Sequence, residues 1–181
     1  GVKWAGSGSR SIPRESLTHL RVEAALICQE AHMTNKLARI CTDGCCIENH
    51  LKGGGIGGWG ATLEYVVDGE VIATKPLSGA LPQTTNNRAE VQAVIFALAA
   101  LKRKGLSVEL VTDSQYVAGQ LAGNKTNTNH DLVQAMRKLA QSHTLTVTVV
   151  KGHSGHAGNE TCDTLAQTAA RAYAASVKVA A

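Results

Sequence analysis

Four acidic residues, Asp43, Glu90, Asp113 and Asp163, occupy positions from which their carboxylates can meet. The sequence places Asp43 and Asp113 at the ends of two predicted strands, and Glu90 and Asp163 in the first turns of two predicted helices. Ligands of open α/β sheets collect outside the strand ends, so the four groups are candidates for one site. Four neighbouring carboxylates repel one another unless cations neutralise them, and oxygen ligands suit Mg²⁺ or Mn²⁺. Two such ions about 4 Å apart can activate a water and stabilise the leaving oxygen of a phosphodiester.

Each acid also has an ordinary structural explanation. Asp113, Asp163 and Glu90 can complement helix N-termini, where negative charge is favoured. Asp43 precedes Gly44, a pair that is common in turns. Spacing alone leaves both interpretations open.

The elements that must position these acids follow from the hydrophobic pattern. Asp68-Gly69 is a two-residue hairpin signal between two strands. Val91, Val94, Ile95, Leu98 and Leu101 form one apolar stripe on a helix that Gly105 ends. We expect strands from Lys36 to the turn at Asp43, and over 59–67, 70–77, 106–112 and 145–150; helices follow the polar run 83–87 and cover 114–122, 131–142 and 159–175. This order predicts an α/β fold, a five-stranded mixed β-sheet flanked by α-helices.

Composition limits the class of protein. The 181 residues suffice for one domain with a hydrophobic core, and the net charge of +4 permits nucleic-acid binding without indicating it. The five cysteines have neither disulfide-framework nor zinc spacing, so we expect reduced thiols. No apolar run is long enough for a membrane span or resembles a signal peptide, so we expect a cytoplasmic protein without membrane contact. We also expect a monomer.

Residues 1–35 differ from the remainder, 36–181. Gly6-Ser7-Gly8-Ser9 resembles a linker, and apolar residues at helical spacing predict a short helix over roughly 14–31. The segment is either a natural extension or was added in cloning, with Met33 as the original start.

Four sequence blocks contain the acids in question. They are Thr42-Asp43-Gly44, Thr84-Thr85-Asn86-Asn87-Arg88-Ala89-Glu90, Thr112-Asp113-Ser114-Gln115-Tyr116-Val117, and the run from Lys151-Gly152-His153 to Cys162-Asp163. In order and separation they resemble type 1 ribonuclease H over most of residues 36–173. The resemblance implies the ribonuclease H-like fold for residues 36–181. It also implies an endonuclease that hydrolyses the RNA strand of RNA–DNA hybrids, leaving 5′-phosphate and 3′-hydroxyl ends.

The resemblance further assigns roles to residues. Asp43 would bridge two Mg²⁺ ions, with Mn²⁺ as a substitute, Glu90 and Asp113 would complete one ion site, and Asp163 the other. His153 matches the loop histidine of the family, which assists proton transfer or product release. Asn49, Asn86, Asn87 and Gln115 match its hybrid-contacting positions, and Thr85 and Asn129 match its phosphate pocket on the DNA strand. Asn86 has a competing role as the cap of the helix that carries Glu90.

The chain departs from many family members between Val117 and Asp131. Those members carry a basic, Trp-containing protrusion there, whereas Lys125 is the only Lys or Arg of this stretch. We therefore expect weaker electrostatic binding of the hybrid and a higher Michaelis constant.

Three alternatives remain open from the sequence: a ribonuclease H domain of a reverse transcriptase, a catalytically decayed hybrid-binding module, and a resolvase or transposase with the same fold. A redox role of the pair Cys45-Cys46 beside Asp43 also stays open, although packing under the glycine-rich loop explains these residues more simply.

Overall fold

The computed structural model of the chain describes residues 34–47, 54–152 and 154–180. Residues 35–181 form one compact unit. The predictions for the segment 1–35 and for Asn49 and His153 fall outside the described residues. Among the described residues, no helix has the length and apolar character needed to cross a membrane.

A five-stranded mixed sheet forms the centre of this unit, in the order β3-β2-β1-β4-β5. The strands are β1 (Lys36–Cys46), β2 (Gly55–Val67), β3 (Glu70–Thr84), β4 (Ser107–Thr112) and β5 (Thr144–Val149). Strands β1, β2 and β3 are antiparallel neighbours, whereas β1, β4 and β5 run parallel. The predicted fold class is therefore confirmed.

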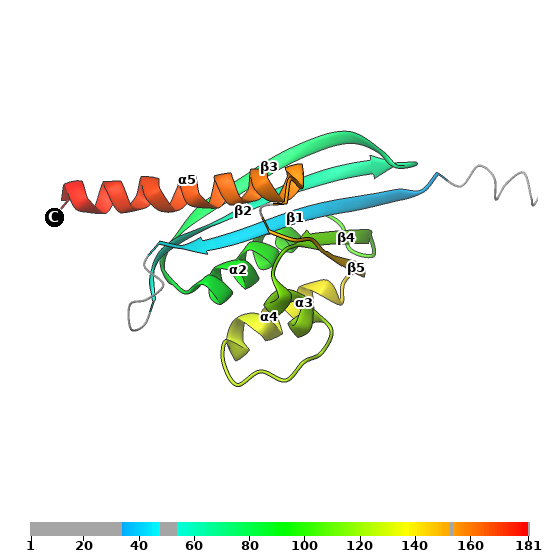
Figure 1. Ribbon diagram of the computed structural model, residues 1–181. Coiled ribbons are helices and arrows are strands. Elements are labelled where there is room, and N and C mark those ends of the chain that lie inside the picture. The colour runs from blue at the N-terminus through cyan, green and yellow to red at the C-terminus, as the bar shows by residue number, and fades with distance from the viewer. Residues whose placement is uncertain (1–33, 48–53, 153, 181) are drawn as a thin grey trace, which may run out of the picture. The chain divides into compact units, whose positions relative to one another are not determined.

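Helices cover both faces of the sheet (Figure 1). On one face lie α2 (Asn86–Ala99), α3 (Gln115–Leu121) and α4 (His130–Ala140), and on the other lies the long helix α5 (Ala157–Ala180). The larger core fills the α2 side, where Ile40, Leu110, Val94 and Met136 are fully buried.

Helix α5 packs unusually closely on the sheet. Its inner residues Cys162, Ala166 and Ala170 are fully buried. A Cβ atom at Gly58 or Gly60 of β2 would collide with the backbone of α5, so these positions require glycine. Small residues on both sides thus bring the α5 backbone directly onto β2, which fixes the rotation of the helix about its axis.

The hairpin between β2 and β3 forms as predicted. Asp68 and Gly69 have φ values of 51° and 86°, as a type I′ turn requires. The strand β3 continues to Thr84, well past the predicted end at Leu77, and accommodates Pro76 because it is an edge strand.

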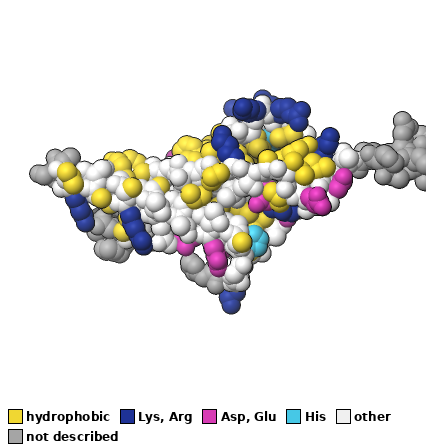
Figure 2. Space-filling model, turned by 90° about the horizontal axis from the view of Figure 1, so that it is seen from above, with side chains coloured by type: hydrophobic (Ala, Val, Ile, Leu, Met, Phe, Trp, Pro, Cys, Tyr) yellow, Lys and Arg dark blue, Asp and Glu magenta, His cyan; other side chains and the backbone are white. Residues whose placement is uncertain are grey.

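The surface that Figure 2 shows carries hydrophobic patches between separated charged side chains. Lys and Arg do not form one continuous stripe on this face. Several of them gather at the upper edge of this view, and the others stand apart from one another.

Candidate metal-dependent active site

Strand β1 and the end of β4 position two of the four acids. The parallel pairing of β1 with β4 ends at Cys41 and Val111, and Asp43 and Asp113 lie two residues beyond those partners. The prediction that Asp43 ends its strand is wrong, because antiparallel pairing with β2 continues β1 to Cys46. Asp43 still lies where the parallel pairing stops, so its carboxylate reaches the same edge of the sheet as that of Asp113.

Glycine at position 44 lets helix α2 approach this edge. A Cβ atom at Gly44 would collide with the backbone of Ala89 and Glu90. The residue is part of β1 and pairs with Trp59, so the predicted turn at Thr42-Asp43-Gly44 is absent. The close contact of β1 with α2 brings Glu90 next to Asp43.

The two acids on helices lie further from the helix N-termini than predicted. Glu90 is the fifth residue of α2, and Asp163 the seventh of α5, so neither is in a first turn. Thr85 caps α2 by accepting a hydrogen bond from the Arg88 amide at 3.5 Å, and Asn86 is not the cap. The predicted capping role of Asn86 is therefore wrong, because its side-chain oxygen accepts a hydrogen bond from the Cys46 amide at 2.8 Å.

Neither aspartate caps a helix either. The cap of α3 is Ser114, whose hydroxyl accepts from the Val117 amide at 3.1 Å, so Asp113 is available for another role. At the start of α5, His156 Nδ1 accepts from the Asn159 amide at 3.2 Å, in agreement with a structural role of His156. The simple capping explanation therefore fails for Asp113 and Asp163.

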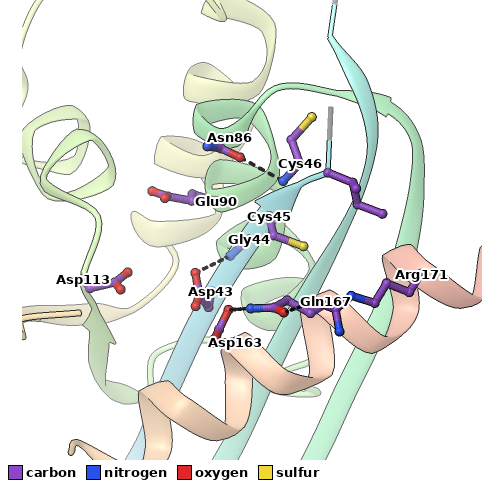
Figure 3. Close-up of a pocket in the computed structure, with 11 residues that line it drawn as sticks. Asp43, Gly44, Cys45, Cys46, Asn86, Glu90, Asp113, Asp163, Gln167 and Arg171 are labelled. Carbon is purple, nitrogen blue, oxygen red and sulfur yellow. Dashed lines mark hydrogen bonds between the residues drawn. The ribbon is translucent and has the colours of Figure 1, made fainter. Parts of the chain in front are cut away.

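Three carboxylates converge closely. One oxygen each of Asp43, Glu90 and Asp113 lies within 4.8 Å of the other two. Asp163 faces the same cleft of about 400 Å³ from α5 (Figure 3) but does not belong to this closest group. All four predicted acids thus line one cleft, at the carboxyl edge of the parallel strands.

Burial and mutual repulsion make this cluster electrostatically costly without a cation. Burial, then the charge of Asp113, raises the pKa of Asp43 to about 7, partly offset by the hydrogen bond from the Gly44 amide at 2.7 Å. Burial also raises the pKa of Glu90, against a hydrogen bond from Ser114. A divalent cation would favour the charged form of both groups, so these residues fit a site for such an ion.

Three side chains that the sequence analysis did not single out support the acids. The amide of Asn159, which is 3% exposed, donates a hydrogen bond to Asp113 Oδ2 at 3.1 Å. Gln167 Nε2 donates to Asp163 Oδ1 at 2.7 Å, and Arg171 Nη2 donates to Gln167 Oε1 at 2.9 Å. Gln167 and Arg171 follow Asp163 by four and eight residues, and this shared helix face is the available signal for them in the sequence.

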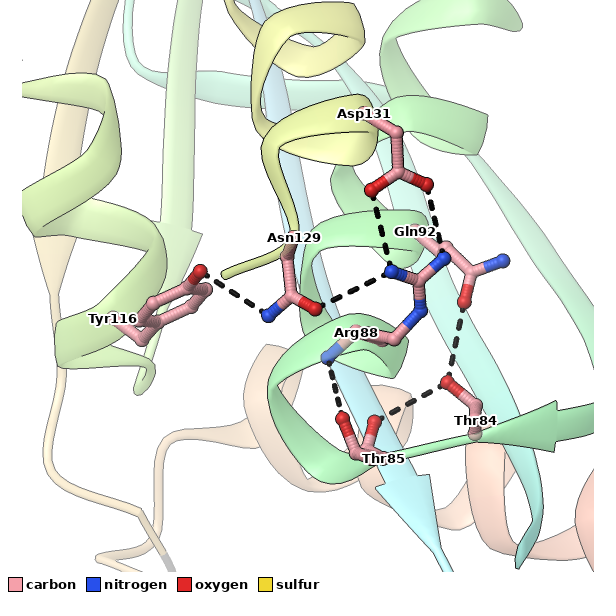
Figure 4. A network of polar contacts seen from close by, with 7 residues as sticks. All are labelled: Thr84, Thr85, Arg88, Gln92, Tyr116, Asn129 and Asp131. Carbon is pink, nitrogen blue, oxygen red and sulfur yellow. Dashed lines mark hydrogen bonds and ion pairs between the residues drawn. The ribbon is translucent and has the colours of Figure 1, made fainter. Parts of the chain in front are cut away.

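Among the described residues predicted to contact the substrate, Asn86 lines the cleft. Asn86, Asn87 and Gln115 are exposed at the N-terminal ends of α2 and α3. Thr85 and Asn129 belong to one polar network through Arg88 (Figure 4). The structure thus joins Thr85 and Asn129 through Arg88 and places Asn86 in the wall of the carboxylate cleft.

Comparison with known proteins identifies the class. Residues 35–171 match the sequence pattern of the ribonuclease H family. The chain belongs to the ribonuclease H family. It is therefore a nuclease.

The relatives are similar over most of their length. The ribonuclease H of Zymomonas mobilis is 41% identical over 150 residues, which are 75% of this chain and 90% of that protein. The ribonuclease H of Francisella philomiragia is 42% identical over 143 residues, 71% of this chain and 87% of that protein.

Solved structures of the family agree. LC9-RNase H1, a type 1 RNase H with the type 2 active-site motif, superimposes with a TM-score of 0.68 at 28% identity, covering 76% of this chain and 74% of its own. RNase H1 of Halobacterium salinarum gives a TM-score of 0.55 at 30% identity, covering 73% and 96%. The resemblance of the four sequence blocks to this family is thus confirmed.

The cysteines near the site do not suit a redox role. Burial raises the pKa of the Cys45 thiol, which leaves little reactive thiolate at neutral pH. Cys46 Sγ donates to the Thr84 carbonyl oxygen at 3.3 Å. Both side chains are half-buried in the cleft wall, as expected of packing residues.

Proposed function

We propose that the protein is an endonuclease that hydrolyses the RNA strand of RNA–DNA hybrids with two divalent ions, Mg²⁺ or, as a substitute, Mn²⁺. Asp43, Glu90, Asp113 and Asp163 would hold the ions. The convergence of these four carboxylates in one cleft of a ribonuclease H fold carries the proposal.

The residues of the cleft prepare it for this chemistry. When bound, the divalent ions supply an activated water and stabilise the leaving oxygen of the phosphodiester. The hydrogen bonds from Asn159 and Gln167 each engage one carboxylate oxygen, on Asp113 and Asp163 respectively. Such outer contacts fix the direction in which the other oxygen points. Cleavage in this arrangement would leave a 5′-phosphate and a 3′-hydroxyl.

Recognition of RNA requires groups that can bond the 2′-hydroxyl, which both donates and accepts. The amides of Asn86, Asn87 and Gln115 can do both, and their exposure, with Asn86 in the wall of the cleft, supports this role. Thr85 and Asn129 would hold a DNA phosphate. The roles of Asn49 and His153 are proposed from the sequence resemblance only.

We also propose that the protein acts as a monomer in the cytoplasm. The free thiols of Cys41, Cys45, Cys46 and Cys162 agree with a reducing compartment.

The substrate class is tested with one duplex sequence in three chemical forms. A hybrid labelled on both strands should lose only its RNA strand, while all-RNA and all-DNA duplexes remain intact. The upstream RNA fragment should be a substrate for ligation to the 5′ end of another RNA, which requires a 3′-hydroxyl. Phosphatase should change the mobility of the downstream fragment, which shows that this fragment carries a 5′-phosphate. Binding without cleavage in either metal would instead identify a catalytically decayed hybrid-binding module.

A further inference from the structure

Three side chains on successive turns of α5 form a row beside the carboxylate cleft. Asp163, Gln167 and Arg171 are spaced by four residues and all line the cleft (Figure 3). The row cannot rotate away, because the adjacent inner row, Cys162 and Ala166, is packed against the glycines of β2. The geometry of the helix therefore determines which way Asp163 faces.

The donors and acceptors along this row can be arranged in only one way. Arg171 has donors only, so the atom of Gln167 that faces it at 2.9 Å must be the side-chain oxygen. The amide nitrogen of Gln167 then faces Asp163 Oδ1 at 2.7 Å, where it donates to an acceptor. A reversed amide would set donor against donor and oxygen against carboxylate, so the arginine fixes the glutamine and the glutamine fixes the aspartate.

The charges that line the cleft indicate a role for this row at the carboxylate site. Four carboxylates line the cleft, and among the described residues that line it Arg171 alone carries a positive charge. Asp163 stands apart from the close group of Asp43, Glu90 and Asp113. Within the described part of the chain the Asp163 carboxylate accepts one hydrogen bond, from Gln167, so its orientation depends on this donor.

We propose that Gln167 and Arg171 are positioning residues that orient the Asp163 carboxylate for its divalent ion, with Arg171 acting through Gln167. This inference rests on the proposed function, since it presumes that Asp163 is a metal ligand. It assigns to Gln167 and Arg171 a contribution to metal affinity rather than to hybrid binding.

The first test measures metal binding without nucleic acid. Calorimetric titration with Mn²⁺ alone should show about tenfold weaker binding at one site for Gln167→Leu, the size expected for losing an outer-shell partner of a ligand. Arg171→Leu should weaken Mn²⁺ binding in the same direction and by less, because Gln167 stays in place without its anchor. Lys178→Leu, which removes a positive charge from the exposed end of the same helix, should bind Mn²⁺ like the wild type.

The double variant decides whether the two residues act in series. If Arg171 acts through Gln167, adding Arg171→Leu to Gln167→Leu should cause no further loss of Mn²⁺ affinity. Additive losses would overturn the relay, since Arg171 would then act independently. In cleavage assays the Mg²⁺ concentration for half-maximal rate should rise, while the KM for the hybrid at saturating Mg²⁺ stays at the wild-type value.

Three further results would contradict the inference. A higher hybrid KM with unchanged Mn²⁺ binding would make Gln167 and Arg171 nucleic-acid contacts. Unchanged Mn²⁺ binding in Gln167→Leu, alongside weakened binding in Asp163→Asn, would overturn the relay and leave the proposed metal site intact. Unchanged binding in Asp163→Asn would overturn the proposed site itself. Arg171 is exposed, so Arg171→Leu reports on the relay even if Gln167→Leu fails to fold.

Discussion

At the scale of single residues, the acids of this protein work against its stability until a cation binds. Asp43 is half-buried beside Asp113, and its pKa in the folded state is raised to about 7. The folded state thus holds the proton more tightly than the unfolded state does. Binding of this proton therefore stabilises the folded state. This contribution is fully present below the ordinary pKa of an aspartate and is lost as the pH rises through 7.

We therefore predict that the free energy of unfolding of the metal-free protein falls, on the order of 3 kcal/mol from this group, between mildly acidic pH and pH 8. Saturating Mg²⁺ should raise the melting temperature much more at pH 8 than at pH 5.5. Asp43→Asn should raise the metal-free melting temperature at pH 8 and reduce the response to Mg²⁺. Glu70→Gln, an exposed acid at the start of β3, is the control and should change neither quantity. An equal Mg²⁺ effect at both pH values would contradict this account.

At the scale of elements, one arginine joins the starts of α2 and α4 (Figure 4). Arg88 contacts both carboxylate oxygens of Asp131, at 3.3 and 3.1 Å, and donates to Asn129 Oδ1 at 3.3 Å. The amide of Asn129 in turn donates to the Tyr116 hydroxyl at 3.2 Å. Asn129 has a left-handed backbone, with φ of 57°, which few residue types adopt. Its side chain is held on one side by Arg88 and on the other by Tyr116.

Replacing Arg88 should therefore affect hybrid binding more than catalysis. Arg88→Met is expected to raise the KM for the hybrid several-fold with kcat near the wild-type value, because the amide of Asn129 loses its orientation. Lys138→Met removes a positive charge from exposed α4 without touching this network and controls for net charge. A fall of kcat at unchanged KM would be incompatible with this role.

The connection between α3 and α4 is short and weakly charged. Helix α3 ends at Leu121 and α4 begins at His130, with Lys125 the only Lys or Arg between them. Replacing residues 122–128 by a longer Lys-rich loop, with Asn129 kept, should lower the Kd for the hybrid and steepen its salt dependence, since each added phosphate contact releases counterions. Fluorescence anisotropy at several salt concentrations measures both, and a serine-rich loop of equal length is the control. Equal affinity of the two loop variants would argue against the electrostatic explanation.

The order of the elements and the hairpin could be predicted from the sequence because they depend on local pattern. Asp68-Gly69 suits a type I′ turn by itself, and the apolar stripe of α2 needs no partner to be seen. The end of β1 could not be predicted, because Cys46 is held in the strand by its partner Gly57 and not by its own sequence. The cap of α2 could not be predicted for the same reason, since the side chain of Asn86 accepts a hydrogen bond from Cys46 of β1.

The four carboxylates were found because their residue types and spacing carry the chemistry. Their supporting residues were missed. Asn159, Gln167 and Arg171 are ordinary helix residues until the packing of α5 against β2 turns one face towards the cleft. A residue that acts through another has no signature of its own in one sequence.

At the scale of the whole molecule, residues 35–181 form a compact unit with its own core on both faces of the sheet. We predict that a protein starting at Met33 melts within about 2 °C of the full chain and cleaves the hybrid at a similar rate, since the core and the four acids are retained. Thermal melting and initial cleavage rates of both proteins measure this. A much lower melting temperature or loss of cleavage would show that residues 1–32 belong to the functional unit.

The measurement closest to the central claim compares the wild type with Asp113→Asn on one labelled RNA–DNA hybrid, in Mg²⁺, in Mn²⁺ and in chelator. Asp113 belongs to the close carboxylate group, and asparagine keeps its shape while removing its charge. We predict that the wild type degrades the RNA strand only when metal is present, and that the variant binds the hybrid, remains folded and leaves the RNA intact. Cleavage by the wild type in chelator, or undiminished cleavage by Asp113→Asn, would contradict a metal-dependent site built on these carboxylates.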